Sequence, residues 1–458
     1  MSARHATPEA LLSHAAAALE RAKAAGAHVA DACVESSRAF TVQVHGGRIE
    51  TLKQSGTLGL GLRVIVDDAV GFCSGTDLSP AGLDDLARRA VALARFSTRD
   101  ADNGSPTPAD AGTYAGADLQ LFDQAALELP VERKIDLALE LERIALGADP
   151  RVTRTDGALV SSSGGAFAIA NSHGIARAWE GTSVSAWVVA LADDRDGRQQ
   201  TGVYGMTKRH LADMASMESI AREAARRAVS RVGARSVPAA RVPVVMSPDI
   251  AASWIGEMYE AFTGEAVIKK SSWLTEKLGT AIASPLFSLV DDGAMVRGLG
   301  SSPYDGEGVA TRRNLLVDRG TCASFAYDHY HARRARTALT GNGIRGFGST
   351  PGIGYHNLYV PAGESSPEAI LKSVDRGFYF DDQGSFGFNP VTGDYSYQAQ
   401  GFWIEKGELA YPVDGVTVAG HSLDMLKHVA AVGSDLEFRT STACPTLLIS
   451  EMTVSGNG

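Results

Sequence analysis

The chain has 458 residues, of which 44% are hydrophobic and 21% charged, and its formal net charge is −10. This is the composition of a globular protein, and it argues against a disordered, fibrous or disulfide-framed chain. At this length we expect two or three domains. The acidic balance disfavours binding to nucleic acid, because phosphates need a basic surface.

The N-terminal stretch and the cysteines indicate the cellular compartment. Residues 1–18 are rich in alanine but are interrupted by His and Glu, so they resemble neither a signal peptide nor an anchor. No run approaches the roughly 20 apolar residues of a membrane helix. The four cysteines are far apart and form no CxxC pair: Cys33, Cys73, Cys322 and Cys444. We therefore expect a cytoplasmic protein without a membrane partner.

Residues 1–100 are expected to form an α+β domain. A helix begins at Thr7-Pro8, where an N-cap residue precedes a proline, and ends at Gly26. Alternating β-branched residues around Gly46-Gly47 and around Asp67-Asp68 predict two hairpins. In chain order we expect a helix over 8–25, a hairpin over 40–51, a hairpin over 59–72 and a helix over 80–94.

Residues 97–117 are rich in Asp, Gly, Pro, Ser and Thr, which predicts a solvated linker. A second α+β domain is expected over 118–235, with a helix over 131–146, strand pairs that turn at 171–174, and a helix over 216–232. The second helix carries arginines whose spacing indicates a solvated face: Arg222, Arg226, Arg227 and Arg231. Arg333, Arg334 and Arg336 are interpreted in the same way, so we expect no nucleic-acid partner.

Residues 241–458 are expected to form a large β-rich domain that begins with a strand at 241–246. The segment 298–403 is dense in glycine and aromatic residues, as irregular β structure requires. A turn is expected at Lys406-Gly407, a helix from about Ser422, and a last strand over 446–450. The predicted class is α+β and multi-domain, with mainly antiparallel strands.

Several motifs in this order resemble the TldD/PmbA family over nearly the whole chain. They are 47–53 followed by 59–64 and Gly71-Phe72, then Asn171-Ser172-His173-Gly174, Thr340-Gly341-Asn342, the segment 401–408, the segment 412–420 and the C-terminal 452–456. The resemblance implies a heterodimer of TldD-type and PmbA-type chains that acts as a zinc metalloprotease on unfolded or short peptides.

The resemblance also implies which subunit this chain is. The TldD-type subunit carries a His-Glu-x-x-x-His helix, in which the histidines bind zinc and the glutamate is the general base. None of the eleven histidines here is followed by Glu. In the matching helix, expected over 247–262, the two histidine positions fall on Ile255 and Glu260, and the base position falls on Gly256. Cys444 lies a few residues too late to match the family's cysteine ligand.

We therefore expect a PmbA-type subunit with no catalytic residue and no metal of its own, and with zinc in a TldD-type partner. A homodimer in the absence of that partner stays open. Two alternatives also stay open. One is a self-sufficient metallo- or serine hydrolase, and the other is a peptide-binding regulatory module, in line with the family's older description as a modulator of DNA gyrase.

The metal alternative rests on His329 and His331, because alternate residues on a strand point to the same side and could ligate one ion. His356 could complete that set after folding. The serine alternative rests on Ser422 in Gly420-His421-Ser422, which falls one residue short of a nucleophile elbow. A helix cap is the simpler interpretation of Ser422. The glycines of 341–346 predict a structural turn, since no strand and helix flank them as a dinucleotide site requires.

The segment 378–388 is rich in aromatic and acidic residues and is a candidate wall of a peptide-binding chamber. The candidate peptide-binding residues in it are Phe378, Tyr379, Phe380, Phe386 and Phe388. Rings could grip peptide side chains while the glycine-rich backbone pairs with an extended peptide. The alternative interpretation is a packed strand at the edge of a sheet, followed by a solvated loop.

Overall fold

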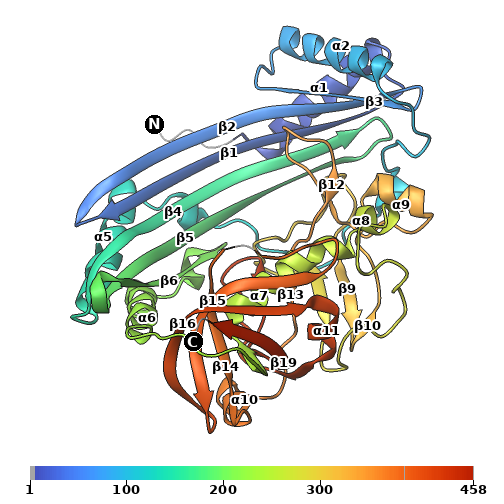
Figure 1. Ribbon diagram of the computed structural model, residues 1–458. Helices are drawn as coiled ribbons and strands as arrows, with labels where there is room; N and C mark the ends of the chain where they lie inside the picture. The colour runs from blue at the N-terminus through green and yellow to red at the C-terminus, as the bar shows by residue number, and fades with distance from the viewer. Residues whose placement is uncertain (1–5, 386, 457–458) are drawn as a thin grey trace.

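A six-stranded antiparallel sheet in the order β3-β2-β1-β4-β5-β6 arches over the rest of the molecule (Figure 1). The computed structural model describes residues 6–385 and 387–456. The strands of this arched sheet are β1 (Val29–His45), β2 (Arg48–Val66), β3 (Ala69–Gly75), β4 (Val152–Asn171), β5 (Ala176–Asp193) and β6 (Gln199–Lys208). Since β1 pairs with β4, strands from both sides of the predicted linker share one sheet.

Four helices cover one face of the arched sheet. Two of them pack on one end of the long strands β1 and β4, and the other two pack on the opposite end of these strands. The predicted helix starts are confirmed, because Thr7 and Ser79 each accept a backbone N–H from the first turn and a proline follows each. The helices are α1 (Pro8–Ala24), α2 (Pro80–Phe96), α5 (Val131–Gly147) and α6 (Met217–Ser230).

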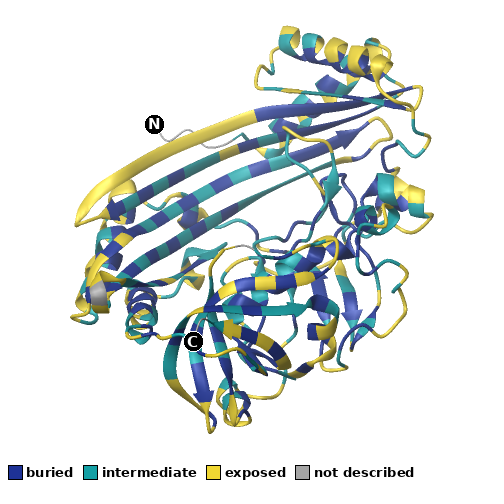
Figure 2. Ribbon diagram, in the orientation of Figure 1, coloured by how far each residue is buried: buried dark blue, intermediate teal, exposed yellow. Residues whose placement is uncertain are grey.

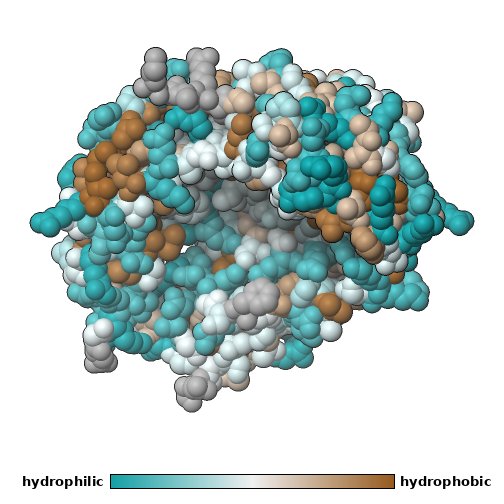
Figure 3. Space-filling view, turned by 90° about the horizontal axis from the view of Figure 1, so that it is seen from above, coloured by the Kyte–Doolittle hydropathy of each residue, from teal (hydrophilic) through white to brown (hydrophobic). Residues whose placement is uncertain are grey.

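The other face of the arched sheet is concave and only half-buried. Along β4 and β5, buried residues alternate with half-buried ones, as Figure 2 shows by colour. The half-buried set includes the hydroxyl pair Ser163 and Ser183, whose oxygens lie 2.8 Å apart, and the ring pair Phe167 and Trp179. Seen from above, the molecular surface is hollowed near its centre (Figure 3).

Both predicted N-terminal hairpins are confirmed. Gly46 and Gly47 have φ values of 61° and 71°, and Asp67 and Asp68 have φ values of 47° and 66°, so both turns use the left-handed conformation that tight hairpins require. One long strand, β2, replaces the two shorter strands expected from the sequence. Its first part, residues 48–58, is exposed throughout.

The prediction of a solvated linker is wrong for Gly104, Ser105 and Pro106, which are buried. The Arg63 guanidinium donates to the Gly104 carbonyl at 2.9 Å and to the Ser105 hydroxyl at 3.1 Å. Ser105 in turn donates to Asp31 at 2.7 Å. The segment is polar because it supplies hydrogen bonds to a buried ionic cluster, and not because it faces water.

A β-rich body lies beneath the arched sheet (Figure 1). It contains a six-stranded sheet in the order β16-β15-β14-β7-β19-β17 and a five-stranded sheet in the order β10-β9-β8-β13-β18. Most pairs are antiparallel, but β7 with β14 and β13 with β18 are parallel. The strands are β7 (Ala240–Met246), β8 (Leu289–Asp292), β9 (Arg313–Asp318), β10 (Thr321–Cys322), β13 (Leu358–Tyr359), β14 (Arg376–Gln383), β15 (Asp394–Glu405), β16 (Glu408–His421), β17 (Val429–Val432), β18 (Thr442–Ala443) and β19 (Leu447–Gly456).

Helix α7 packs between the two sheets of this body and fills its core with Trp254, which is fully buried. The predicted α+β class is confirmed. Among the described residues, no helix is long and apolar enough to cross a lipid bilayer. The remaining helices are α3 (Pro108–Ala111), α4 (Gln124–Leu127), η1 (Arg195–Gly197), η2 (Leu211–Asp213), α7 (Pro248–Met258), η3 (Tyr259–Phe262), α8 (Gly264–Ile268), α9 (His329–Ala335), α10 (Pro367–Lys372) and α11 (Ser422–Lys427).

A hairpin of β11 (Gly343–Ile344) and β12 (Gly352–Ile353) joins the body to the arched sheet. Arg345, in the hairpin, forms an ion pair with Asp31 of β1. Phe347 lies against β2 at Gly61, where any side chain would overlap the Phe347 backbone. A second joint lies at α6, where Arg231 pairs with two aspartates of β14. The two joints hold the concave face above the body.

Candidate functional site

A cavity of about 750 Å³ opens between α6, β6, α7 and the segment 435–444. It lies where the β6 end of the arched sheet meets the body, so its walls come from distant parts of the chain. Among the described residues that line it, seven carry carboxylates and three carry guanidinium groups. The carboxylates are Glu223, Asp249, Glu257, Asp381, Asp382, Asp435 and Glu437, and the guanidinium groups are Arg227, Arg231 and Arg439.

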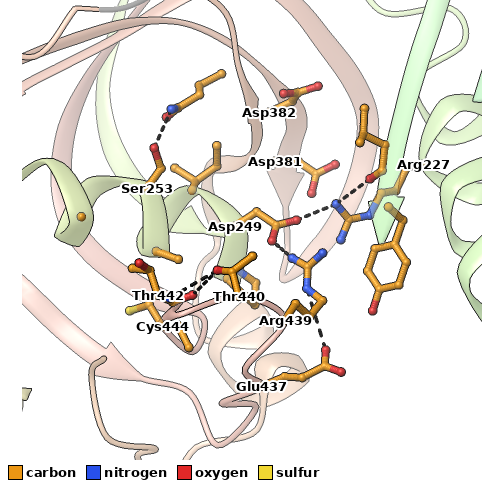
Figure 4. Close-up of a pocket in the computed structure, with 18 of the residues that line it drawn as sticks. Arg227, Asp249, Ser253, Asp381, Asp382, Glu437, Arg439, Thr440, Thr442 and Cys444 are labelled. Atoms are coloured by element: carbon orange, nitrogen blue, oxygen red, sulfur yellow. Dashed lines mark hydrogen bonds and ion pairs between the residues drawn. The ribbon is translucent and has the colours of Figure 1, made fainter. Parts of the chain in front are cut away.

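An ionic cluster ties the two walls of this cavity together (Figure 4). Asp249, in the first turn of α7, accepts from Arg227 of α6 at 2.6 Å and pairs with Arg439. Both guanidinium groups also lie over the Tyr204 ring of β6, at 4.8 and 4.7 Å from its centroid. Arg227 further pairs with Glu223 at 2.9 Å. The cluster fixes α7 to the arched sheet by charge-assisted bonds.

The prediction of a solvated arginine face on α6 is half wrong. Arg222 and Arg226 are exposed, with 61% and 64% of their side chains accessible, as expected. Arg227 and Arg231, however, are only 16% and 4% accessible and line the cavity. Helical spacing correctly placed the arginines on one face of α6. Part of that face is buried, because carboxylates of β14 and α7 pair with Arg227 and Arg231.

Helix α7 presents small and polar groups to the cavity and apolar groups to the core. Ile255, one predicted histidine-equivalent position, is fully buried in the core. Gly256 and Glu257 face the cavity. Because apolar residues recur along the other side of the helix, the sequence correctly predicted both the helix and the burial of that side.

Glu257 is the central carboxylate of the site. The Tyr397 hydroxyl donates to its Oε1 at 2.6 Å, and its Oε2 is shielded from solvent without a hydrogen-bond partner. Burial raises the pKa of Glu257 above its ordinary value, and the neighbouring hydroxyls of Tyr397 and Ser253 oppose that rise. Gln383 lies on the same wall, with its side-chain nitrogen donating to Ser253 at 2.7 Å and its Oε1 unpartnered.

A second cavity, of about 620 Å³, continues past Gly256 and Glu257, which line both cavities. Its wall also includes Glu260, the other predicted histidine-equivalent position, and Phe388. Gly256 and Glu257 therefore lie between the two cavities, which we together call the cleft along α7.

The candidate aromatic residues are distributed differently from the prediction. Phe378 and Phe380 are fully buried in the core, because β14 is an interior strand that pairs with β15 and β7. The expectation of an edge strand is therefore wrong. Tyr379 packs on the opposite side of β14, against Phe402. Phe388 lines the second cavity, and Phe386 lies outside the described residues. The following residues, Asp381, Asp382 and Gln383, supply the cavity wall.

The strand prediction for His329 and His331 is wrong, because both residues lie in helix α9. Positions two apart on a helix do not face one ion. His329 is 6% exposed, and its pKa is lowered to about 4 by burial and by nearby arginines. His331 bonds through Nδ1 to Asp328 at 2.7 Å. His356 does not complete a site, since its Nε2 and Nδ1 lie 2.7 and 3.1 Å from backbone carbonyl oxygens.

Ser422 does not form an accessible nucleophile. It is fully buried at the start of α11, and its hydroxyl accepts from the Trp254 indole at 3.3 Å. The helix cap is His421 and not Ser422, so that interpretation shifts by one residue. Cys444 lines the first cavity but is 1% exposed, and burial raises the pKa of its thiol well above the ordinary value.

The cleft does not fit a zinc ion. In the part of the chain that the structure describes, no group of three or more His, Cys, Asp and Glu residues is placed to hold a metal. The described residues that line the two cavities include no histidine. A tetrahedral zinc centre needs nitrogen, sulfur and carboxylate ligands that converge, and carboxylates dispersed along a cleft do not provide them.

Comparison with known proteins gives consistent matches along the chain. Models of the PmbA/TldA metallopeptidase family match as domain 1 over residues 30–94, the central domain over 125–232 and the C-terminal domain over 239–456. Metalloprotease PmbA of Escherichia coli O157:H7 is 30% identical over 438 residues, which cover 96% of this chain and 94% of that protein. A PmbA homolog of Haemophilus influenzae is 30% identical over 441 residues, or 96% and 95% of the two chains.

Solved structures share the fold. A putative modulator of a DNA gyrase from Thermotoga maritima superposes with a TM-score of 0.86 at 25% identity, over 96% of this chain and 98% of that one. TldE from Thermococcus kodakarensis superposes with a TM-score of 0.86 at 22% identity, over 96% and 99% of the two chains.

Proposed function

Because the chain belongs to the PmbA/TldA metallopeptidase family, we propose that it acts in peptide hydrolysis as the non-catalytic subunit. In this proposal a TldD-type partner carries the zinc and cleaves the peptide. This chain and its partner together enclose a peptide-binding space, and this chain holds unfolded or short peptides in the cleft along α7.

The observation that supports this role is what α7 presents to the cleft. Gly256 and Glu257 line the cleft, and the adjacent Ile255 is buried in the core. A glycine cannot accept a proton and an isoleucine cannot ligate zinc. The cleft is nevertheless large, polar and connected to the half-buried face of the arched sheet through Trp187 of β5. It has room for a peptide, and the two positions of α7 named above supply neither a zinc ligand nor a general base.

The chemistry assigned to this chain is binding and orientation. When bound in the partner, zinc would supply a nucleophilic water at neutral pH. Residues of this chain would align the peptide, using backbone groups and the hydroxyls of the concave face, and would exclude bulk water once the partner closes the space. A folded protein could not enter such a space, which explains the expected preference for unfolded or short peptides.

The test is to purify the full chain alone and together with its TldD-type partner from the same genome. We expect the isolated chain to bind no stoichiometric zinc and to leave an unfolded peptide intact. The complex is expected to hydrolyse the same peptide, and a chelator should abolish that activity. A variant of the partner without its metal ligands is the matched control. Chelator-sensitive hydrolysis by the isolated chain would refute the proposal.

A further inference from the structure

The cleft carries an excess of negative charge that its own arginines do not neutralise. Arg227 and Arg439 are occupied by Asp249, and Arg231 is occupied by Asp381 and Asp382 at 2.9 and 2.5 Å. Glu257 is different, because the side chains that stabilise its charge are the neutral hydroxyls of Tyr397 and Ser253. The cleft therefore holds, between its two cavities, a carboxylate without a cationic partner among the described residues.

Three neighbouring residues carry unpartnered polar atoms, since Gln383 bonds to Ser253 and both Ser253 and Tyr395 interact with Glu257. Among the described residues, Glu257 Oε2, Gln383 Oε1 and the Tyr395 hydroxyl are all shielded from solvent and lack a hydrogen bond. Tyr395 is 1% exposed, and burial and the nearby Glu257 raise the pKa of its hydroxyl well above the ordinary value. Buried polar groups in native proteins are almost always paired, so such a group of orphans marks a place for an absent partner.

The chemistry of these unpartnered atoms defines which kind of ligand group could bind them. Glu257 Oε2 and Gln383 Oε1 are hydrogen-bond acceptors, and an unpaired buried acceptor is costly. A ligand that satisfies both must carry at least two N–H or O–H donors. A positive charge on that ligand would also balance Glu257, and the surrounding carboxylates would repel an anion. An ammonium or guanidinium group meets all of these conditions.

We infer that the pocket formed by Ser253, Glu257 and Gln383 receives a nitrogen cation of the bound peptide, and that the cleft therefore selects peptides that place a lysine, an arginine or a free amino terminus there. This inference rests on the proposed peptide-binding function. It adds a substrate class to it, namely peptides with a cationic anchor.

The experiment measures binding of short unstructured peptides to the full chain by fluorescence anisotropy. The reference peptide has an acetylated amino terminus and norleucine at its centre. Three matched peptides replace norleucine with lysine, replace it with arginine, or restore the free amino terminus. We expect at least one of these cations to tighten binding about tenfold, and the peptide that does so identifies the source of the cation.

Two variants locate the effect. Glu257→Gln removes the charge and is expected to reduce the preference for the cation, measured as the ratio of the affinities for the cationic and the norleucine peptides, to about twofold or less. Glu20→Gln is the matched control, because it makes the same change of charge at an exposed position of α1 that lines neither cavity, and it should keep the preference. If Glu257→Gln does not fold, Gln383→Met removes the second acceptor and should weaken the same preference.

Equal affinity of the wild-type chain for all four peptides would overturn the inference and leave the proposed function standing. A preference that survives in Glu257→Gln would also overturn it. Failure of every peptide to bind, with or without the partner subunit, would overturn the proposed function and the inference together.

Discussion

Replacing Arg63 with alanine is expected to destabilise the protein by about 3–5 kcal/mol, because it leaves a buried carboxylate short of its partner. Arg63 is 6% exposed and bonds to Asp31 at 2.8 Å through Nε. Burial alone would raise the pKa of Asp31, but Arg63 and Arg345 together hold it well below the ordinary range. Without Arg63, Arg345 alone remains to neutralise Asp31, and the Gly104 carbonyl loses a donor.

The loss can be measured by urea unfolding followed by tryptophan fluorescence. Hydrogen exchange at the Gly104 and Ser105 amides supplies a second readout, since Arg63 fastens this segment to the arched sheet. Arg99→Ala is the matched control, because Arg99 pairs with Asp67 on the surface and should matter little. Equal stability of Arg63→Ala and Arg99→Ala would contradict the assignment of Arg63 as a buried anchor.

The contribution of Glu307 to wild-type stability is expected to decline between about pH 4.5 and pH 8. Burial, together with Asp305 and Asp328, raises the pKa of Glu307 from 4.5 to about 8. The folded protein therefore keeps a proton that the unfolded chain releases above its own pKa. Each increase in pH across that interval favours the unfolded chain, and the contribution levels off above the folded-state pKa.

Glu307→Gln should remove this decline and stabilise the protein by roughly 2–4 kcal/mol near pH 8, after allowance for coupling to Asp305. Glutamine can still accept the backbone N–H of His329, which now bonds to Oε2 at 2.7 Å. Thermal unfolding of both proteins across the pH range measures the difference. Glu260→Gln, at an exposed position, serves as the control. Parallel pH profiles for wild type and Glu307→Gln would disprove the expectation.

Local features of the chain were predictable because their causes lie within a few residues. Thr7-Pro8 and Ser79-Pro80 start helices since a side-chain oxygen caps the first turn and proline loses no helical hydrogen bond there. Lys406-Gly407 forms the expected turn, with φ values of 52° and 78°. The apolar side of α7 could likewise be assigned from its spacing.

The candidate site was predictable only in outline. The helix that lines it and the absence of histidine from that helix follow from the sequence. The cavity walls do not, because Arg231 and Asp382 are 151 positions apart and Tyr397 and Glu257 are 140 apart. The prediction that Phe378 and Phe380 contact a peptide fails because both rings are in the core. An alternating strand pattern does not indicate which of its two sides the rest of the protein covers.

The sequence by itself determined the α+β class, the helix starts and turns, and the family resemblance, since each depends on near neighbours or on the order of motifs. The tertiary structure decided which charges are buried and which face one another. Asp31 illustrates the reason, because its partner Arg345 lies 314 positions away. The cost of burying a charge depends on such distant partners, so the ionic cluster, the buried segment 104–106 and the cleft at Glu257 appear only when the chain is folded.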